Sequence, residues 1–262
     1  MKKFLLASAA AICLSVPAYA DSFNDAEIVQ VGFANSASEF QDGYLNTAVT
    51  FQLGAYNDAE IQQAAFHNDA GLMQIGYDNS GVIHQGGYRN DAVIAQIGGT
   101  NDVFINQIGR DINASAVQIG WDNGATVAQI GLMDEASVFQ IGDRNNVMIA
   151  QVGYSHEMAV IQAGTGNRAN GRQEGFDHEA TILQAGIGND AYLRQTGAKN
   201  SATVAQAGKG NAATVQQTGF RNDATTIQVG QDNTARQTQM GAFNAATIVQ
   251  VGRGNTAVQT QR

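Results

Sequence analysis

The sequence predicts an all-β fold, a two-sheet β-solenoid of the cross-β, amyloid-like kind, with about eleven coils of 22 residues. Three observations predict it. Gln recurs at every eleventh position from Gln30 to Gln261, Gly follows nearly every Gln by two residues, and Asn precedes most of them by six. The unit N-x-A-x-(V/I)-x-Q-x-G-x-x thus repeats at a fixed spacing, which is typical of solenoids whose units bury their faces on one another.

Within each unit, alternate positions repeat the same chemistry, as one face of a β-strand requires. A period of eleven also fits an α-helix with 3.67 residues per turn. However, a Gly in every unit would cost a helix about 1 kcal/mol each time. The alternation, seen for example in Asn90–Gln96, therefore favours strands over helices.

The residue before each Gln divides the units into two alternating classes. In one class it is mostly polar, as at Gln62, Arg172 and Thr238, and in the other it is apolar throughout. The apolar series comprises Val29, Phe51, Met73, Ala95, Val117, Phe139, Ile161, Leu183, Ala205, Ile227 and Val249. We therefore expect two strands per coil and two stacked sheets, named sheet A for the apolar series and sheet B for the other.

The inward positions carry Asn, Ala, an aliphatic residue and Gln, each expected to stack on its own kind at about 4.8 Å. A carboxamide has two donors and an acceptor oxygen, so stacked amides can hydrogen-bond along the solenoid axis. The predicted Gln ladder on sheet A comprises Gln30, Gln52, Gln74, Gln96, Gln118, Gln140, Gln162, Gln184, Gln206, Gln228 and Gln250. The predicted Asn ladder on sheet B comprises Asn35, Asn57, Asn79, Asn101, Asn123, Asn145, Asn167, Asn189, Asn211, Asn233 and Asn255. The last inner positions of the aliphatic column, Gln237 and Gln259, are polar, which fits weak capping or a continued amide ladder.

The stretch Gly-x-x-Asn predicts the turn between strands, because Gly and Asn both tolerate positive φ. Ala65 is the one residue that interrupts the Gly column. The predicted turn glycines of sheet A include Gly32, Gly54, Gly76, Gly98, Gly120 and Gly142.

Residues 1–20 are predicted to be a secretion signal peptide, and residues 21–262 a single repeat domain. Lys2 and Lys3 precede an apolar run, and Ala18-Tyr19-Ala20 fits a cleavage site. The apolar run is too short for a membrane-spanning helix. Cleavage would remove Cys13 and Pro17, the only Cys and the only Pro, so the exported domain would have no disulfide.

The charge of the chain argues against nucleic acid or anionic lipid as partner. Without Lys2 and Lys3, 12 basic side chains stand against 23 acidic ones, a net charge of −11. An excess of negative charge repels phosphate groups. We therefore expect no nucleic acid partner and no membrane insertion.

The unit N-x-A-x3-Q-x-G-x2, repeated after a secretion signal, resembles the curlin repeat of bacterial curli subunits over residues 24–261. The resemblance implies a structural subunit of extracellular, amyloid fibres in the biofilm matrix, with roles in adhesion and cell aggregation. It also implies export through the periplasm and an outer-membrane secretion pore, a nucleator subunit at the cell surface, and the chain itself as partner in a homopolymer. This chain has many more repeats than the familiar subunits. It also enters them directly after the predicted cleavage site, without the family's Gly/Asn-rich leader.

The terminal coils, Asn24–Gln30 and Asn255–Gln261, keep the repeat pattern. Monomeric solenoids carry polar or helical caps, and open strand edges invite pairing with another chain. We therefore expect end-to-end assembly, with the apolar stripe of sheet A as a candidate lateral contact.

The Asn column departs from Asn at Ile112, Asp134, His156 and His178, which lie 22 residues apart and so stack on sheet A. Neighbouring imidazoles beside a carboxylate suit a pH-sensitive or metal-binding patch. Drift of the repeat at a turn position explains them equally simply and is the favoured interpretation, so no metal site is predicted.

No Ser/His/Asp, Cys/His or paired-carboxylate constellation stands outside the repeat, so we predict no catalytic site and no cofactor. The alternative function is a monomeric, secreted solenoid that binds ice or another surface. Ice binding favours flat Thr-x-Thr rows, whereas this chain has a single Thr column, Thr181, Thr203, Thr225 and Thr247.

Overall fold

The computed structural model describes residues 23–262, which fold into 22 strands without a helix. The predicted signal peptide, with Cys13, Pro17 and the expected start at Asp21, lies outside the described residues. The strands form two parallel sheets of 11 strands each, which confirms the predicted β-solenoid. Among the described residues, no helix is long and apolar enough to cross a membrane.

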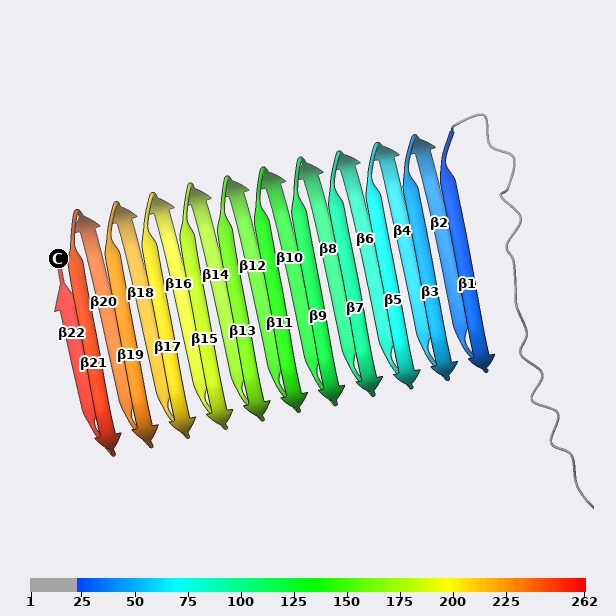
Figure 1. The fold of residues 1–262 in the computed structure, drawn as a ribbon. Helices are drawn as coiled ribbons and strands as arrows, with labels where there is room; N and C mark the ends of the chain where they lie inside the picture. The colour runs from blue at the N-terminus through cyan, green and yellow to red at the C-terminus, as the bar shows by residue number, and fades with distance from the viewer. Residues whose placement is uncertain (1–22) are drawn as a thin grey trace, which may run out of the picture.

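Consecutive strands alternate between the two sheets, so that each pair makes one coil (Figure 1). Sheet A contains β1 (Asp25–Phe33), β3 (Thr47–Ala55), β5 (Asp69–Tyr77), β7 (Asp91–Gly99), β9 (Asn113–Trp121), β11 (Glu135–Asp143), β13 (Glu157–Thr165), β15 (Glu179–Ile187), β17 (Ser201–Lys209), β19 (Asp223–Gln231) and β21 (Ala245–Arg253). Sheet B contains β2 (Ser36–Tyr44), β4 (Asp58–Phe66), β6 (Ser80–Tyr88), β8 (Asp102–Arg110), β10 (Gly124–Leu132), β12 (Asn146–Tyr154), β14 (Arg168–Phe176), β16 (Asp190–Ala198), β18 (Ala212–Phe220), β20 (Thr234–Ala242) and β22 (Thr256–Gln261).

Every strand pairs in parallel with the strand one coil further on, with equivalent repeat positions side by side. Gln30 lies beside Gln52 and Gly32 beside Gly54, and the same register continues to the last pair, β20 with β22. The period-2 pleat then fixes which side chains face inward. On β11, Val138 and Gln140 are buried, whereas Phe139 between them is 37% exposed.

The core is a thin layer between the two sheets. Buried Ala and aliphatic side chains from successive coils form one continuous cluster that runs from Ala48 to Ala224. Small residues at the Ala positions bring the sheets together. Since one coil cannot enclose this layer alone, the stability of each coil depends on its two neighbours.

The turn differs from the sequence-based expectation in one respect. The Gly residues do have positive φ, as at Gly98 (126°), but the second left-handed residue is the one before Asn, for example Thr100 (52°). The Asn residues were expected to take this conformation, and none does. Asn101 must point inward to bond Asn79 and Gly120, so the residue before it makes the bend. Most residues at that position are not Gly and therefore carry a conformational cost of about 1 kcal/mol.

The Gly column is required by close contact between coils as well as by φ. A Cβ on Gly98 would lie 2.0 Å from the carbonyl oxygen of Gly120, and a Cβ on Gly142 would lie 2.1 Å from that of Gly164. Ala65 occupies the same column with a φ of 81°. The second coil therefore carries a strained residue where its neighbours have none.

We predict that Ala65→Gly stabilises the folded chain by about 1 kcal/mol, because it removes a side chain from a left-handed position. Gly142→Ala should destabilise it by more than that amount, because the coils must also separate. The measurement is the guanidinium midpoint of the β-sheet circular dichroism signal. Gly86→Ala is the matched control, since nothing lies within 4 Å of its added Cβ, and its midpoint should not move. A lower midpoint for Ala65→Gly would contradict this account of the column.

Candidate functional site

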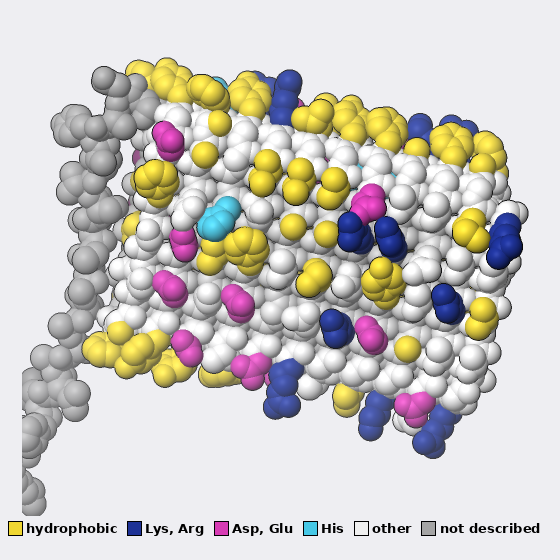
Figure 2. All heavy atoms as spheres, turned by 180° about the vertical axis from the view of Figure 1, so that it is seen from behind, with side chains coloured by type: hydrophobic (Ala, Val, Ile, Leu, Met, Phe, Trp, Pro, Cys, Tyr) yellow, Lys and Arg dark blue, Asp and Glu magenta, His cyan; other side chains and the backbone are white. Residues whose placement is uncertain are grey.

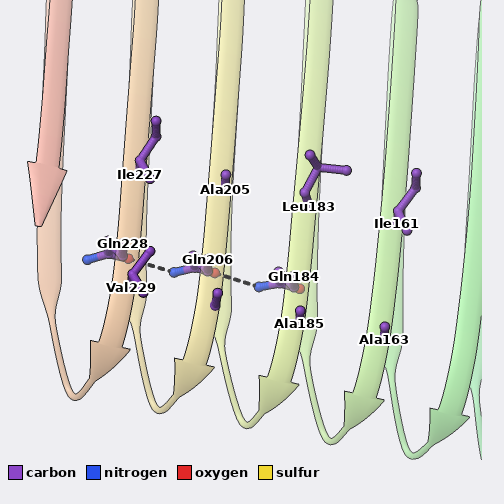
Figure 3. A pocket seen from close by; sticks show the side chains of 11 residues that line it. Ile161, Ala163, Leu183, Gln184, Ala185, Ala205, Gln206, Ile227, Gln228 and Val229 are labelled. Atoms are coloured by element: carbon purple, nitrogen blue, oxygen red, sulfur yellow. Dashed lines mark hydrogen bonds between the residues drawn. The ribbon is translucent and has the colours of Figure 1, made fainter. Parts of the chain in front are cut away.

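The Gln side chains form a hydrogen-bonded ladder through the whole of each sheet. Figure 3 shows three of them on sheet A, where Gln184 Nε2 donates to Gln206 Oε1 and Gln206 Nε2 donates to Gln228 Oε1, both at 2.8 Å. The same bond links every neighbouring pair from Gln30 to Gln250. In every step the N–H group points towards the C-terminal coil.

From Gln41 to Gln261, each ladder Gln also ties the two sheets together. Gln206 Nε2 donates to the backbone oxygen of Asp190 on sheet B at 2.9 Å, and Gln140 Nε2 donates to that of Gly124 at 3.0 Å. Both amide hydrogens and the amide oxygen are thereby used inside the core. This complete hydrogen bonding matters for stability, because an unpaired buried amide costs about 1–3 kcal/mol.

The Asn ladder of sheet B runs in the opposite direction. Asn123 Nδ2 donates to Asn101 Oδ1 at 3.1 Å, so this N–H group points towards the N-terminal coil. The backbone N of Asn123 donates to the same oxygen at 3.2 Å, and Nδ2 also reaches Gly142 O at 2.7 Å. The Asn side chain therefore holds the turn to the coils on both sides, from Asn35 to Asn255 without a break.

We predict that replacing Gln118, Gln140 and Gln162 together by Leu lowers the denaturant midpoint and slows assembly. Leu keeps the bulk, but the ladder bonds of Gln96 and Gln184 to these residues are lost, at about 1–3 kcal/mol for each unpaired group. Gln62→Leu with Gln216→Leu is the matched control, because both side chains point outward from sheet B. Unchanged assembly of the triple variant, with unchanged seeding specificity, would show that the ladder is incidental.

The sheet-A Asn column contains two stacked imidazoles. The rings of His156 and His178 lie 5.0 Å apart and nearly parallel, at 6°. His178 Nε2 lies 3.0 Å from Glu174 O and its Nδ1 accepts from Asn200 N at 3.2 Å. These partners assign the neutral ring with hydrogen on Nε2. The ring thus supplies one donor and one acceptor at the places where Asn supplies them.

Burial lowers the pKa of His178, and the neighbouring His156 acts in the same direction, while the carbonyl of Glu174 opposes it. Protonation would place a hydrogen on Nδ1, where the backbone N–H of Asn200 already points. Charged groups near the column are Glu135, Glu157 and Glu179 on the outward side, and Lys199, which lies 3.5 Å from Asp177. Asp177 acts on His178 against the effect of burial and favours the protonated ring.

Asp134 precedes the two His residues in the column and is fully buried. Its Oδ1 accepts from His156 N at 3.0 Å, but Oδ2 has no hydrogen-bond partner. At the equivalent place Asn145 Nδ2 donates to two carbonyls, and a carboxylate has no hydrogen to donate. Burial raises the pKa of Asp134, against the effect of His156. Its contribution to stability is therefore present at low pH and is lost as the pH rises through the folded-state pKa.

These residues share a column, but their polar atoms face the backbone of neighbouring coils rather than one another. Within residues 23–262, no group of three or more His, Cys, Asp or Glu side chains is arranged to hold a metal ion. Ile112, the first departure, is fully buried and apolar. The column is thus a set of four different replacements for one Asn.

We predict that the turn at His178 weakens as the solution becomes acidic. Because the folded-state pKa is lowered, the unfolded chain takes up the proton first, so the stability is complete above the ordinary pKa of 6.5 and is lost below it. Hydrogen exchange should show that the N–H of Asn200 loses protection between pH 7 and pH 5, relative to Asn211 N–H on sheet B. His178→Asn should abolish this relative loss. Equal behaviour of the parent and the variant would contradict the assignment.

The apolar stripe of sheet A is exposed along the outer face. It is hollowed over β13 to β19, where Ala205 lies in the column between Leu183 and Ile227 (Figure 3). The neighbouring column carries the small residues Ala163, Ala185 and Ala207. At the C-terminal end Val249 is 60% exposed. The stripe therefore remains accessible over its whole length in one folded chain.

One functional candidate was missed from the sequence. Glu39 occupies the inner aliphatic column of β2, and both its carboxylate oxygens are buried without a hydrogen-bond partner. Burial, with smaller contributions from Glu27 and Asp25, raises the pKa of Glu39 to about 7, while the nearby Thr50 hydroxyl acts in the opposite direction. The neighbouring Thr50 hydroxyl likewise makes no hydrogen bond. The signal was available, because an acidic residue in a column of aliphatic residues breaks the repeat.

Comparison with known families gives a match to the Curlin associated repeat at residues 76–109, 164–197, 189–219 and 230–261. Each matched segment covers at least one coil and includes the inward Gln residues and the turn glycines. No curated protein matches the chain.

Proposed function

Since the chain belongs to the curlin-repeat family, we propose that it is a structural subunit of extracellular, curli-like amyloid fibres in a bacterial biofilm matrix. The family and the β-solenoid fold are structural rather than catalytic. The proposed role is mechanical: the chain polymerises by stacking coil on coil, and the polymer mediates adhesion and cell aggregation. We propose no enzymatic activity and no cofactor.

The observation that carries the proposal is the equivalence of the coils. In the described chain, β1 and β21 are the edge strands of sheet A, and β2 and β22 are the edge strands of sheet B. Each edge strand has the same Gln position and the same register as the strands inside the array. A second copy can therefore continue both sheets with the hydrogen bonds that already join the coils of one copy.

The proposed route to the cell surface follows the family. We propose that the chain passes through the periplasm and leaves the cell through an outer-membrane pore. A nucleator subunit then starts the fibre. The proposed partners are thus the pore, the nucleator and further copies of the chain itself. Cells that lack the pore should retain the chain inside and show no surface fibres. Fibres of unchanged abundance in such cells would contradict this route.

We predict that the chain from Asp21 onward, at micromolar concentration, forms fibres with a lag that disappears when fragmented fibres are added. Thioflavin fluorescence follows the kinetics, and aligned fibres should diffract at about 4.7–4.8 Å along their axis, because the strands stack in that direction. The alternative, a monomeric binding solenoid, predicts a folded chain that stays monomeric for days. That outcome would exclude the proposed function.

A further inference from the structure

The inner aliphatic column is polar near its two ends and apolar between them. Glu39 and Thr50 lie in the first two coils, and Thr226, Gln237 and Gln259 lie in the last coils. From Ile61 to Val215 every residue of the column is Ile, Leu, Val, Ala or Gly. Of these, Glu39 on β2 and Gln259 on β22 lie in the terminal coils, where a second copy would make contact in an end-to-end polymer.

Near the N-terminal end, the Glu39 carboxyl makes no hydrogen bond within residues 23–262, although the Thr50 hydroxyl is close enough to act on it. The charged groups that act on it, Asp25 and Glu27 on β1, are both acidic. No Lys or Arg occurs between residue 23 and Arg89. A carboxyl whose oxygens are buried in these surroundings without a hydrogen bond and without a compensating charge is costly.

The C-terminal end has donors to offer. Gln237 Nε2 lies 3.5 Å from Gln259 Oε1, in the same sense as every Gln ladder bond, and Thr226 donates to Gln237 Oε1 at 3.0 Å. The oxygen of Gln259 is thereby used within the chain. Its Nε2 group is on the side of the amide that faces the next coil.

The direction of the Gln ladders allows only one orientation of a second copy. Gln30 and Gln41 direct their N–H groups into the array, so their oxygens are turned towards the N-terminal face. Gln250 and Gln261 accept from the preceding coil, so their N–H groups are turned towards the C-terminal face. Two N-terminal faces would bring oxygen against oxygen, whereas an N-terminal face on a C-terminal face continues the ladder.

The charges of the chain favour the same orientation. Residues 23–142 contain 14 acidic and two basic side chains, whereas residues 143–262 contain eight acidic and ten basic ones. In Figure 2, acidic side chains are spread over the half of the array on the left, and most Lys and Arg side chains lie over the right half. The two ends of the described array therefore attract each other, and two like N-terminal ends repel.

Continuing the register by one coil places β1 of the next copy on β21 and β2 of the next copy on β22. Gln261 then meets Gln41 of the next copy, and Gln259 meets Glu39 of the next copy. We propose that the two copies join head to tail through a buried polar contact in which Gln259 Nε2 donates to the Glu39 carboxyl of the next copy. This inference rests on the proposed function and adds the residues that select partner and orientation.

The test exchanges the two groups. Gln259→Glu places two carboxyls in the joint, and at pH 7.5 it should slow elongation from its own fragmented fibres by about tenfold or more, because like charges oppose each other in a desolvated contact. Adding Glu39→Gln to it restores one amide and one carboxyl in exchanged positions. The double variant should elongate within about twofold of the parent, since the complementary pair is present again. Gln216→Glu, which adds the same charge on the outer face of β18, should elongate like the parent.

Glu39→Gln alone provides a second test, which does not depend on the Gln259 variant. The parent elongation rate should change around pH 7, where the Glu39 carboxyl titrates. Because Glu39→Gln removes the carboxyl that faces Gln259 inside the joint, this change should disappear. Circular dichroism of each variant separates lost folding from lost joining. The inference is overturned if the double variant is as slow as Gln259→Glu, or if Gln259→Glu elongates as fast as Gln216→Glu. Failure of the parent itself to form fibres would instead reject the proposed function.

Discussion

The structure depends on one constraint: a buried Gln amide is satisfied only if an identical amide lies one coil above it and another lies one coil below. Gln140 accepts from Gln118 at 2.7 Å and donates to Gln162 at 2.9 Å. If the strand that carries Gln140 shifted by a single residue, an outward side chain would replace this amide. The buried partners of Gln140, which are the Gln118 donor, the Gln162 acceptor and the Gly124 carbonyl, would then be unpaired, at about 1–3 kcal/mol each. A shift of two residues would keep aliphatic side chains inside but would still break the ladder, so polar groups, rather than aliphatic ones, set the coil length of 22 residues. The Gly column follows from the same constraint, because coils close enough for this bond leave no room for a Cβ at the turn.

Much of this architecture could be predicted from the sequence, because repetition removes the usual ambiguity. One alternation in one unit is weak evidence, but the same alternation at every Gln indicates strands, their register and their inward faces. The two sheets could be told apart only from outward residues such as Phe139 and Arg172, since the inward ones are nearly the same in both. The candidate residues His156 and His178 could be placed in one column, but their hydrogen bonds to the backbone could not be foreseen.

Other features depend on geometry that the repeat does not encode. The left-handed residue before Asn carries almost any side chain, so composition gave no sign of it. Another case is the pair Met158 and Gly171, from opposite sheets. A Cβ on Gly171 would lie 2.1 Å from Met158 Sδ, so the large residue on one sheet requires the small one on the other. Each looks like an isolated exception in its own column. Only the distance between the columns shows that they compensate each other.

The contrast between the Gln and Asn columns shows which bond matters more to the array. Gln occupies all 22 of its positions, while Asn gives way to Ile112, Asp134, His156 and His178. The Asn side chain bonds to groups of the turn on its own side, such as Asn101 Oδ1 and Gly142 O for Asn123. An imidazole has a donor and an acceptor at similar separation and can replace it there. A Gln side chain instead spans the core to a carbonyl of the opposite sheet while it continues the ladder. No other side chain has that length, two donors and an acceptor without a charge, so a replacement would break contacts within the sheet and between the sheets at once.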